Sequence, residues 1–133
     1  MAGETLSSRT PLARARGLGS AKSGLGHWWA QRWTALALIP LVIWVVIMFA
    51  AHAGDGYGAT RAWLGRPEAG VPMILLVAAI LHHAQLGLQV VIEDYVKGDA
   101  LRLCSLIVVK GIAILLGLTA AMAVLAIVFG ATL

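Results

Sequence analysis

Residues 71–92 read VPMILLVAAILHHAQLGLQVVI, and this segment contains no Asp, Glu, Lys or Arg. It exceeds the ~20 apolar residues that a helix needs to cross the ~30 Å hydrocarbon core of a bilayer. Residues 33–54 and 111–133 have the same property. Because helices satisfy their own backbone hydrogen bonds in lipid, we predict an all-α membrane protein. The three predicted transmembrane helices span about residues 28–53, 71–95 and 101–131.

The composition also indicates a membrane protein. Of the 133 residues, 60% are hydrophobic and only 12% are charged, which excludes an ordinary water-soluble domain. The net charge of +4 comes mainly from the N-terminal segment and the helix ends, and no basic patch with interleaved aromatic residues predicts nucleic-acid binding. Cys104 is the single cysteine, so the sequence predicts neither an internal disulfide nor a cysteine metal site.

Residues 1–26 form a predicted N-terminal arm, and residues 27–133 form a predicted three-helix anchor domain. The arm is rich in Ser and Arg and is interrupted by glycines, as in an organellar transit peptide or a cytoplasmic arm of a bacterial membrane protein; we favour the latter. The positive-inside rule places the N-terminus in the cytoplasm and predicts an up-down-up bundle. The cations predicted on the inner side are Arg9, Arg14, Arg16, Lys22, Arg32, Lys97 and Arg102.

The middle segment carries polar residues, which are costly in a membrane and are usually retained for function. One stripe of this helix is polar and should face protein; its members are His82, Gln85, Gln89 and Glu93. The neighbouring face holds His83 and, one turn later, Gly87. A glycine at this position leaves an open surface where a flat cofactor could lie against the backbone.

The adjacent histidines are candidate haem ligands, because imidazole is a usual axial ligand of haem iron. Spacing alone does not choose between His82 and His83. His27 lies near the inner membrane surface and His52 near the outer one, so a second axial imidazole would have to come from a partner chain. The alternative is a buried histidine that hydrogen-bonds to a neighbouring helix.

A second candidate site, Asp94-Tyr95, begins about eleven residues after His83, roughly 16 Å along the helix axis. Tyr95 could hydrogen-bond a quinone carbonyl and carry a proton, or it could be an interfacial belt tyrosine. A proton-coupled transporter would be expected to hold a carboxylate at mid-membrane. All acidic residues lie instead in loops or at helix ends, which argues against transport.

The third apolar segment is predicted to be a scaffold, because it consists almost entirely of Ala, Ile, Leu, Val and Gly. Gly111, Gly117 and Ala121 are small residues that would permit close packing of helices. Lys110, near the start of this segment, can extend its ammonium group to the membrane interface and needs no special role.

Three blocks of the sequence resemble a known family. They are PLARARGLGSA at residues 11–21, HWWAQRWTA at residues 27–35, and His83 followed by Asp94-Tyr95. Together they are similar to the small hydrophobic membrane anchor of succinate dehydrogenase (respiratory complex II), in its alphaproteobacterial form. The resemblance covers the arm and the first two predicted helices.

The resemblance implies roles for individual residues. His83 would be one axial ligand of the iron of a b-type haem, shared with a second anchor subunit of cytochrome b556 type. Tyr95 would hydrogen-bond ubiquinone, with Asp94 shaping the same site. Arg32 would lie near the haem propionates or the quinone, and His27 is a further cofactor-binding candidate.

The resemblance also implies a function. The chain would not be catalytic alone but would anchor succinate dehydrogenase (quinone) in the bacterial cytoplasmic (inner) membrane. It would serve electron transport from the iron-sulfur subunit to ubiquinone, while a flavoprotein subunit oxidises succinate in the tricarboxylic acid cycle. The alternatives are a haem-free structural anchor of a fumarate reductase-like complex and a small proton-coupled transporter.

Overall fold

The computed structural model describes residue 12 and residues 21–130, so most of the predicted arm lies outside the described residues. The described part of the chain is α-helical and contains no strand. Its elements are α2 (Ala21–Ala51), α3 (Tyr57–Leu64), α4 (Pro67–Tyr95) and α5 (Asp99–Val128). Among the described residues, three helices are long and apolar enough to cross a membrane, and these are α2, α4 and α5. The predicted all-α class with three candidate spans is confirmed.

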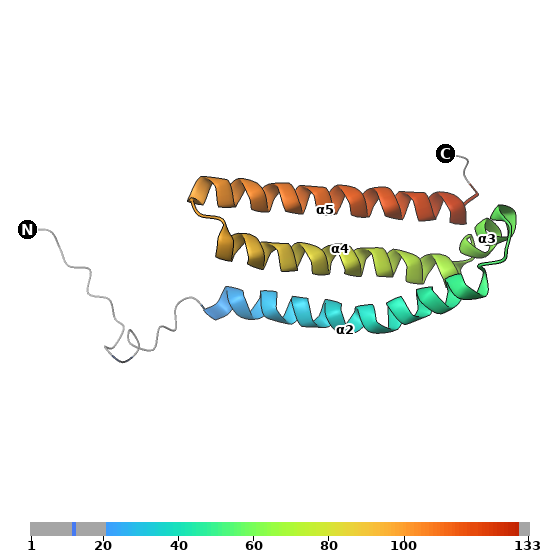
Figure 1. Cartoon of the computed structure of the whole chain (residues 1–133), viewed down its shortest axis with the longest axis horizontal. Coiled ribbons are helices and arrows are strands. Elements are labelled where there is room, and N and C mark those ends of the chain that lie inside the picture. Colours follow the sequence, from blue (N-terminus) through green and yellow to red (C-terminus); the bar gives the residue numbers. More distant parts are fainter. Residues whose placement is uncertain (1–11, 13–20, 131–133) are drawn as a thin grey trace, which may run out of the picture.

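The three long helices form a single row with α4 in the middle (Figure 1). α4 packs against α2 on one side and α5 on the other, whereas α2 and α5 make no contact with each other within the described chain. Consecutive long helices run in opposite directions (Figure 1). The row is an open layer rather than the predicted bundle. Lipid chains are as apolar as leucine, so membrane helices need not close around a common hydrophobic core.

The helix ends differ from those expected from the sequence. α4 begins at Pro67, not near residue 71, so Pro67 occupies the first helical position and Pro72 lies inside the helix. A proline suits that position, since its φ is already helical and its missing N–H would have had no partner there. α2 begins at Ala21, inside the segment predicted as an arm. The turn from α4 to α5 uses Gly98 with φ 99°, a conformation that residues with a side chain rarely adopt.

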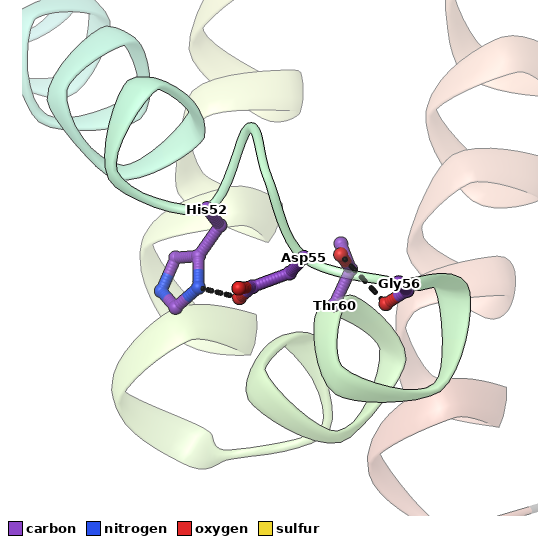
Figure 2. A network of polar contacts seen from close by, with 4 residues as sticks. All are labelled: His52, Asp55, Gly56 and Thr60. Carbon is purple, nitrogen blue, oxygen red and sulfur yellow. Dashed lines mark hydrogen bonds and ion pairs between the residues drawn. The ribbon is translucent and has the colours of Figure 1, made fainter.

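The short helix α3 lies between the first two predicted spans, where the sequence predicted no helix. The Trp63 ring of α3 packs against the end of α2, with centroid distances of 4.6 Å to the His52 ring and 6.4 Å to the Trp44 ring. Beside it, His52 Nδ1 and Asp55 Oδ2 lie 2.6 Å apart (Figure 2). A helix of 8 residues is marginal in isolation, so the ring contacts of Trp63 with Trp44 and His52 stabilise it.

α4 and α5 approach each other closely at Gly70. A Cβ atom on this residue would lie 2.8 Å from Val128 Cγ2, too close for an ordinary contact. The glycines expected to permit close packing do not do so: a Cβ on Gly111 would meet nothing within 4 Å, and one on Gly117 would make an ordinary 3.4 Å contact with Leu81. The close approach therefore depends on a glycine of α4, near the α3 end of the molecule.

Candidate functional site

The first half of α2 presents polar side chains to α4. His27, Gln31 and Thr34 are spaced by one helical turn each, which places them on one face of α2. Opposite this face, α4 contributes His83 and Gly87; a Cβ atom on Gly87 would lie 3.7 Å from Gln31 Nε2. We call these five residues the α2–α4 polar cluster.

His83 is the centre of the α2–α4 polar cluster and is half-buried. Its Nδ1 atom lies 3.0 Å from the Thr34 hydroxyl oxygen, and its Nε2 atom lies 3.4 Å from the Gln31 side-chain nitrogen. Both ring nitrogens therefore have partners on another helix. These interhelical contacts set both the position and the orientation of the imidazole ring.

Two buried atoms of the cluster have no hydrogen-bond partner among the described residues, His27 Nε2 and Gln31 Oε1. A buried polar atom without a partner costs roughly 1–3 kcal/mol. The amide oxygen can only accept a hydrogen bond, whereas an imidazole nitrogen donates or accepts according to its tautomer. The cluster can therefore bind a further group that brings its own hydrogen-bonding atoms.

His82 has a different environment from its neighbour. Its side chain is exposed and lines an open hollow at the α4–α5 interface together with Gln85 and Lys110. Within the described part of the chain, His82 makes no hydrogen bond. The two histidines that sequence spacing did not separate are thus distinguished by the helix that each faces: α2 for His83 and α5 for His82.

The polar stripe predicted along α4 forms a series of hydrogen bonds that runs toward the α4–α5 turn. Gln85 Nε2 donates to Gln89 Oε1 at 3.3 Å, and Gln89 Nε2 donates to Glu93 Oε1 at 2.8 Å. Gln85 is buried, whereas Glu93 and His82 at the two ends of the stripe are exposed. The prediction that this stripe faces protein is confirmed for Gln85, which is buried, and His82 lies beside α5. For Glu93 it stays a prediction.

The other predicted site residues lie apart from the cluster. Tyr95 is the last residue of α4 and is 80% exposed, and Asp94 beside it is exposed as well. The Arg32 guanidinium carbon lies 4.3 Å from the centroid of the Trp28 ring, a cation–π contact. Among the described residues, none of the three predicted positions is brought into contact with His83.

Gln31 and Thr34 were not predicted as partners of His83. Their spacing from His27 was the available signal, because it places all three residues on one face of α2. Polar residues at the foot of a membrane helix are also typical of the interface with water, so this spacing is ambiguous by itself. Only the packing of α2 on α4 shows that this face meets the histidine.

Comparison with known proteins identifies the family. A family model for the succinate dehydrogenase/fumarate reductase transmembrane subunit matches residues 7–129. The chain belongs to this family. The succinate dehydrogenase hydrophobic membrane anchor subunit of Rickettsia bellii is 38% identical over 111 residues, which are 84% of this chain and 89% of that protein. The subunit so named in Paracoccus denitrificans is 35% identical over 89 residues, which are 67% of this chain and 69% of that protein.

These matches confirm the resemblance to the alphaproteobacterial anchor subunits. A third relative, the succinate dehydrogenase membrane anchor subunit of Reclinomonas americana, is 31% identical over 96 residues, which are 70% of this chain and 80% of that protein. The family match extends through α5, beyond the arm and two helices that carried the resemblance. The chain is therefore a multi-pass membrane protein, the membrane anchor subunit of succinate dehydrogenase, and it works with other subunits of that complex.

Proposed function

We propose that this anchor subunit supplies His83 as one axial ligand of a b-type haem shared with a second anchor subunit of cytochrome b556 type. The observation that supports this role is the environment of His83, which lies between two helices beside the unpaired buried atoms of His27 and Gln31. When bound, a haem supplies an iron centre that takes up and releases single electrons.

The α2–α4 polar cluster fits a haem by its chemistry. The porphyrin is flat and largely apolar, and Gly87 presents no side chain on the α4 side of the cluster. Its propionates are carboxylates, for which His27 Nε2 is a candidate hydrogen-bond partner. Arg32 follows Gln31 along α2 and supplies a positive charge of the kind that binds carboxylates.

The Asp94-Tyr95 end of α4 is proposed as the part of the ubiquinone site that this chain contributes. The exposed Tyr95 hydroxyl can donate a hydrogen bond to a quinone carbonyl oxygen. Asp94 lies at a helix C-terminus, where negative charge opposes the helix dipole, so a role other than helix stability is required for it. Asp94 would shape the site beside the tyrosine.

The proposed assembly follows from these sites and from the charge distribution. The N-terminus and the α4–α5 turn would lie on the cytoplasmic side of a bacterial inner membrane, where the cations concentrate. Tyr95 would then face the iron-sulfur subunit, which delivers electrons to ubiquinone. A separate flavoprotein subunit would oxidise succinate.

The experiment is an absorption spectrum of the purified complex with single substitutions in this anchor chain. His83→Ala is expected to abolish or shift the reduced b-type band, because the iron loses a ligand. The matched control His82→Ala should keep the band, since His82 faces α5. A band that survives His83→Ala unchanged would exclude the ligand assignment. A complex that contains no b-type haem would favour the haem-free structural anchor.

A further inference from the structure

We propose that Thr34 positions His83 for the haem iron by holding the imidazole in the tautomer that carries its proton on Nδ1. This inference rests on the proposed role of His83 as an axial ligand. The Thr34 hydroxyl oxygen lies 3.0 Å from His83 Nδ1, on the side of the ring away from Nε2. Thr34 would act through the histidine and would not touch the iron, so it is a positioning residue.

The Thr34 hydroxyl donates its single proton within its own helix. A threonine hydroxyl has one proton to donate and two lone pairs that accept. The Thr34 oxygen lies 2.8 Å from the carbonyl oxygen of Ala30 and 3.0 Å from that of Gln31, and its proton is donated to its own helix there. In the remaining contact, Thr34 therefore accepts and the Nδ1–H of His83 donates.

The other ring nitrogen leads to the same tautomer. The Gln31 amide nitrogen lies 3.4 Å from His83 Nε2 and can only donate, so Nε2 faces it with its lone pair. The reverse tautomer would require the Gln31 amide to turn over. Its two N–H donors would then occupy the place where Oε1 is buried without a partner. The Thr34 proton would also have to leave both carbonyl oxygens.

The two contacts of His83 differ in distance and in the rotational freedom of the partner side chain. Thr34 is short and β-branched, so its side chain has little rotational freedom. Gln31 reaches Nε2 through a long side chain, and the 3.4 Å distance exceeds the usual range of roughly 2.7–3.2 Å. The absence of a side chain on Gly87 leaves room beside the Gln31 amide. Nε2 is therefore the nitrogen that can be released for a metal, while Nδ1 remains held.

The Nδ1 contact should also tune the haem. A metal-bound histidine commonly donates its second N–H to an outer partner, which fixes the ring and raises its basicity. A more basic ligand favours ferric over ferrous iron and so lowers the midpoint potential. Outer partners of this kind change metal affinity by about 10–100-fold, and the potential shifts by the part of this change that differs between ferric and ferrous iron. A tenfold change in the ferric-to-ferrous preference corresponds to about 59 mV for one electron.

The experiment is a redox titration of the b-type absorption band in the purified complex. Thr34→Val and Thr34→Ala remove the hydroxyl and are expected to raise the midpoint potential by up to about 59 mV, the value for a tenfold change in the ferric-to-ferrous preference. Thr34→Ser keeps the hydroxyl and should keep the potential. The low-spin electron paramagnetic resonance g values should shift in the first two variants. The control is Thr119→Val, because Thr119 donates to the Leu115 carbonyl at 2.8 Å, like Thr34, but faces no histidine among its described contacts.

The outcomes separate this inference from the proposed function. An unchanged potential and unchanged g values in Thr34→Val or Thr34→Ala would overturn the role of Thr34, and so would a shift in Thr34→Ser or Thr119→Val of the same size. If His83→Ala abolishes the band while Thr34→Val leaves the potential unchanged, only the role of Thr34 fails. If the unaltered complex contains no b-type haem, or His83→Ala leaves the band unchanged, both proposals fail.

Discussion

The two interfaces of α4 have opposite characters. Against α2, the hydrogen bonds of His83 cross from one helix to the other. Against α5, the polar side chains Gln85 and Gln89 bond along α4 itself. What joins α4 to α5 is the packing of apolar atoms, closest where Gly70 meets Val128.

The difference shows that hydrogen bonds specify one interface of α4 and apolar packing specifies the other. A hydrogen bond across an interface depends on helix register, and a slip of one residue displaces one helix by about 1.5 Å along its axis. Such a slip would separate His83 from Thr34 and Gln31, whereas bonds along one helix would be unchanged. The α2–α4 interface is therefore specified by polar contacts, and the α4–α5 interface by close fit.

The largest expected effect tests the close fit. In Gly70→Ala, the new Cβ would lie 2.8 Å from Val128 Cγ2. A valine side chain is stiff, so the helices must move apart. Overpacking of this kind costs roughly 1–3 kcal/mol of unfolding free energy, measurable by dodecyl sulfate unfolding of the chain in mixed micelles. Gly111→Ala is the control, because a Cβ there meets nothing within 4 Å. Equal losses in the two variants would contradict a close fit at Gly70.

The second prediction tests whether a polar side chain at the C-terminal end of α4 also has a function, as proposed for the α2–α4 interface. Tyr95→Phe removes a hydroxyl from a side chain that is 80% exposed, so the stability of the chain should not change. Loss of one hydrogen bond to quinone, roughly 0.5–1.5 kcal/mol, should lower quinone reductase turnover about two- to tenfold. Tyr57→Phe is the matched control, because Tyr57 is also 80% exposed but lies in α3. Normal turnover in Tyr95→Phe would exclude the quinone role.

The smallest effect tests whether the α4–α5 interface depends on polar contacts at all. Gln85→Leu removes the 3.3 Å hydrogen bond to Gln89 and replaces a buried amide with an apolar side chain of similar size. Hydrogen bonds within membrane proteins contribute about 0.6 kcal/mol on average, so the loss in dodecyl sulfate unfolding should not exceed this. The haem band should be unaltered. A loss of unfolding free energy larger than that of Gly70→Ala, or a shifted band, would show that polar contacts are also important at the α4–α5 interface.

Much of the fold could be predicted from single segments. Insertion of a helix into lipid depends on the apolar length of that segment alone, so the three long helices were recognisable. The helix α3 was missed because its stability depends on Trp63 stacking against Trp44 of α2 and against His52, just beyond the end of α2. The start of α4 was misplaced because Pro67 and Pro72 are both compatible with a first helical turn, and only one begins the helix.

The candidate site was also predicted only in part. Polar side chains that are costly in a membrane indicated His82, His83 and the Asp94-Tyr95 pair from the sequence. The partners Gln31 and Thr34 were missed, because residues near a helix foot are also explained by contact with water. In the structure, both side chains contact His83 of α4 and belong to the α2–α4 polar cluster.

The class of protein, its candidate membrane spans and its family could all be read from the amino-acid order, because apolar length and local motifs are properties of short stretches of chain. Helix packing was needed to establish that His83 faces α2 while His82 faces α5, and that the Thr34 hydroxyl oxygen lies 3.0 Å from His83 Nδ1. The physical reason is that adjacent residues on a helix point about 100° apart. Which of them meets a partner depends on the rotation and register of the packed helices, and these are set by contacts between residues far apart in the chain.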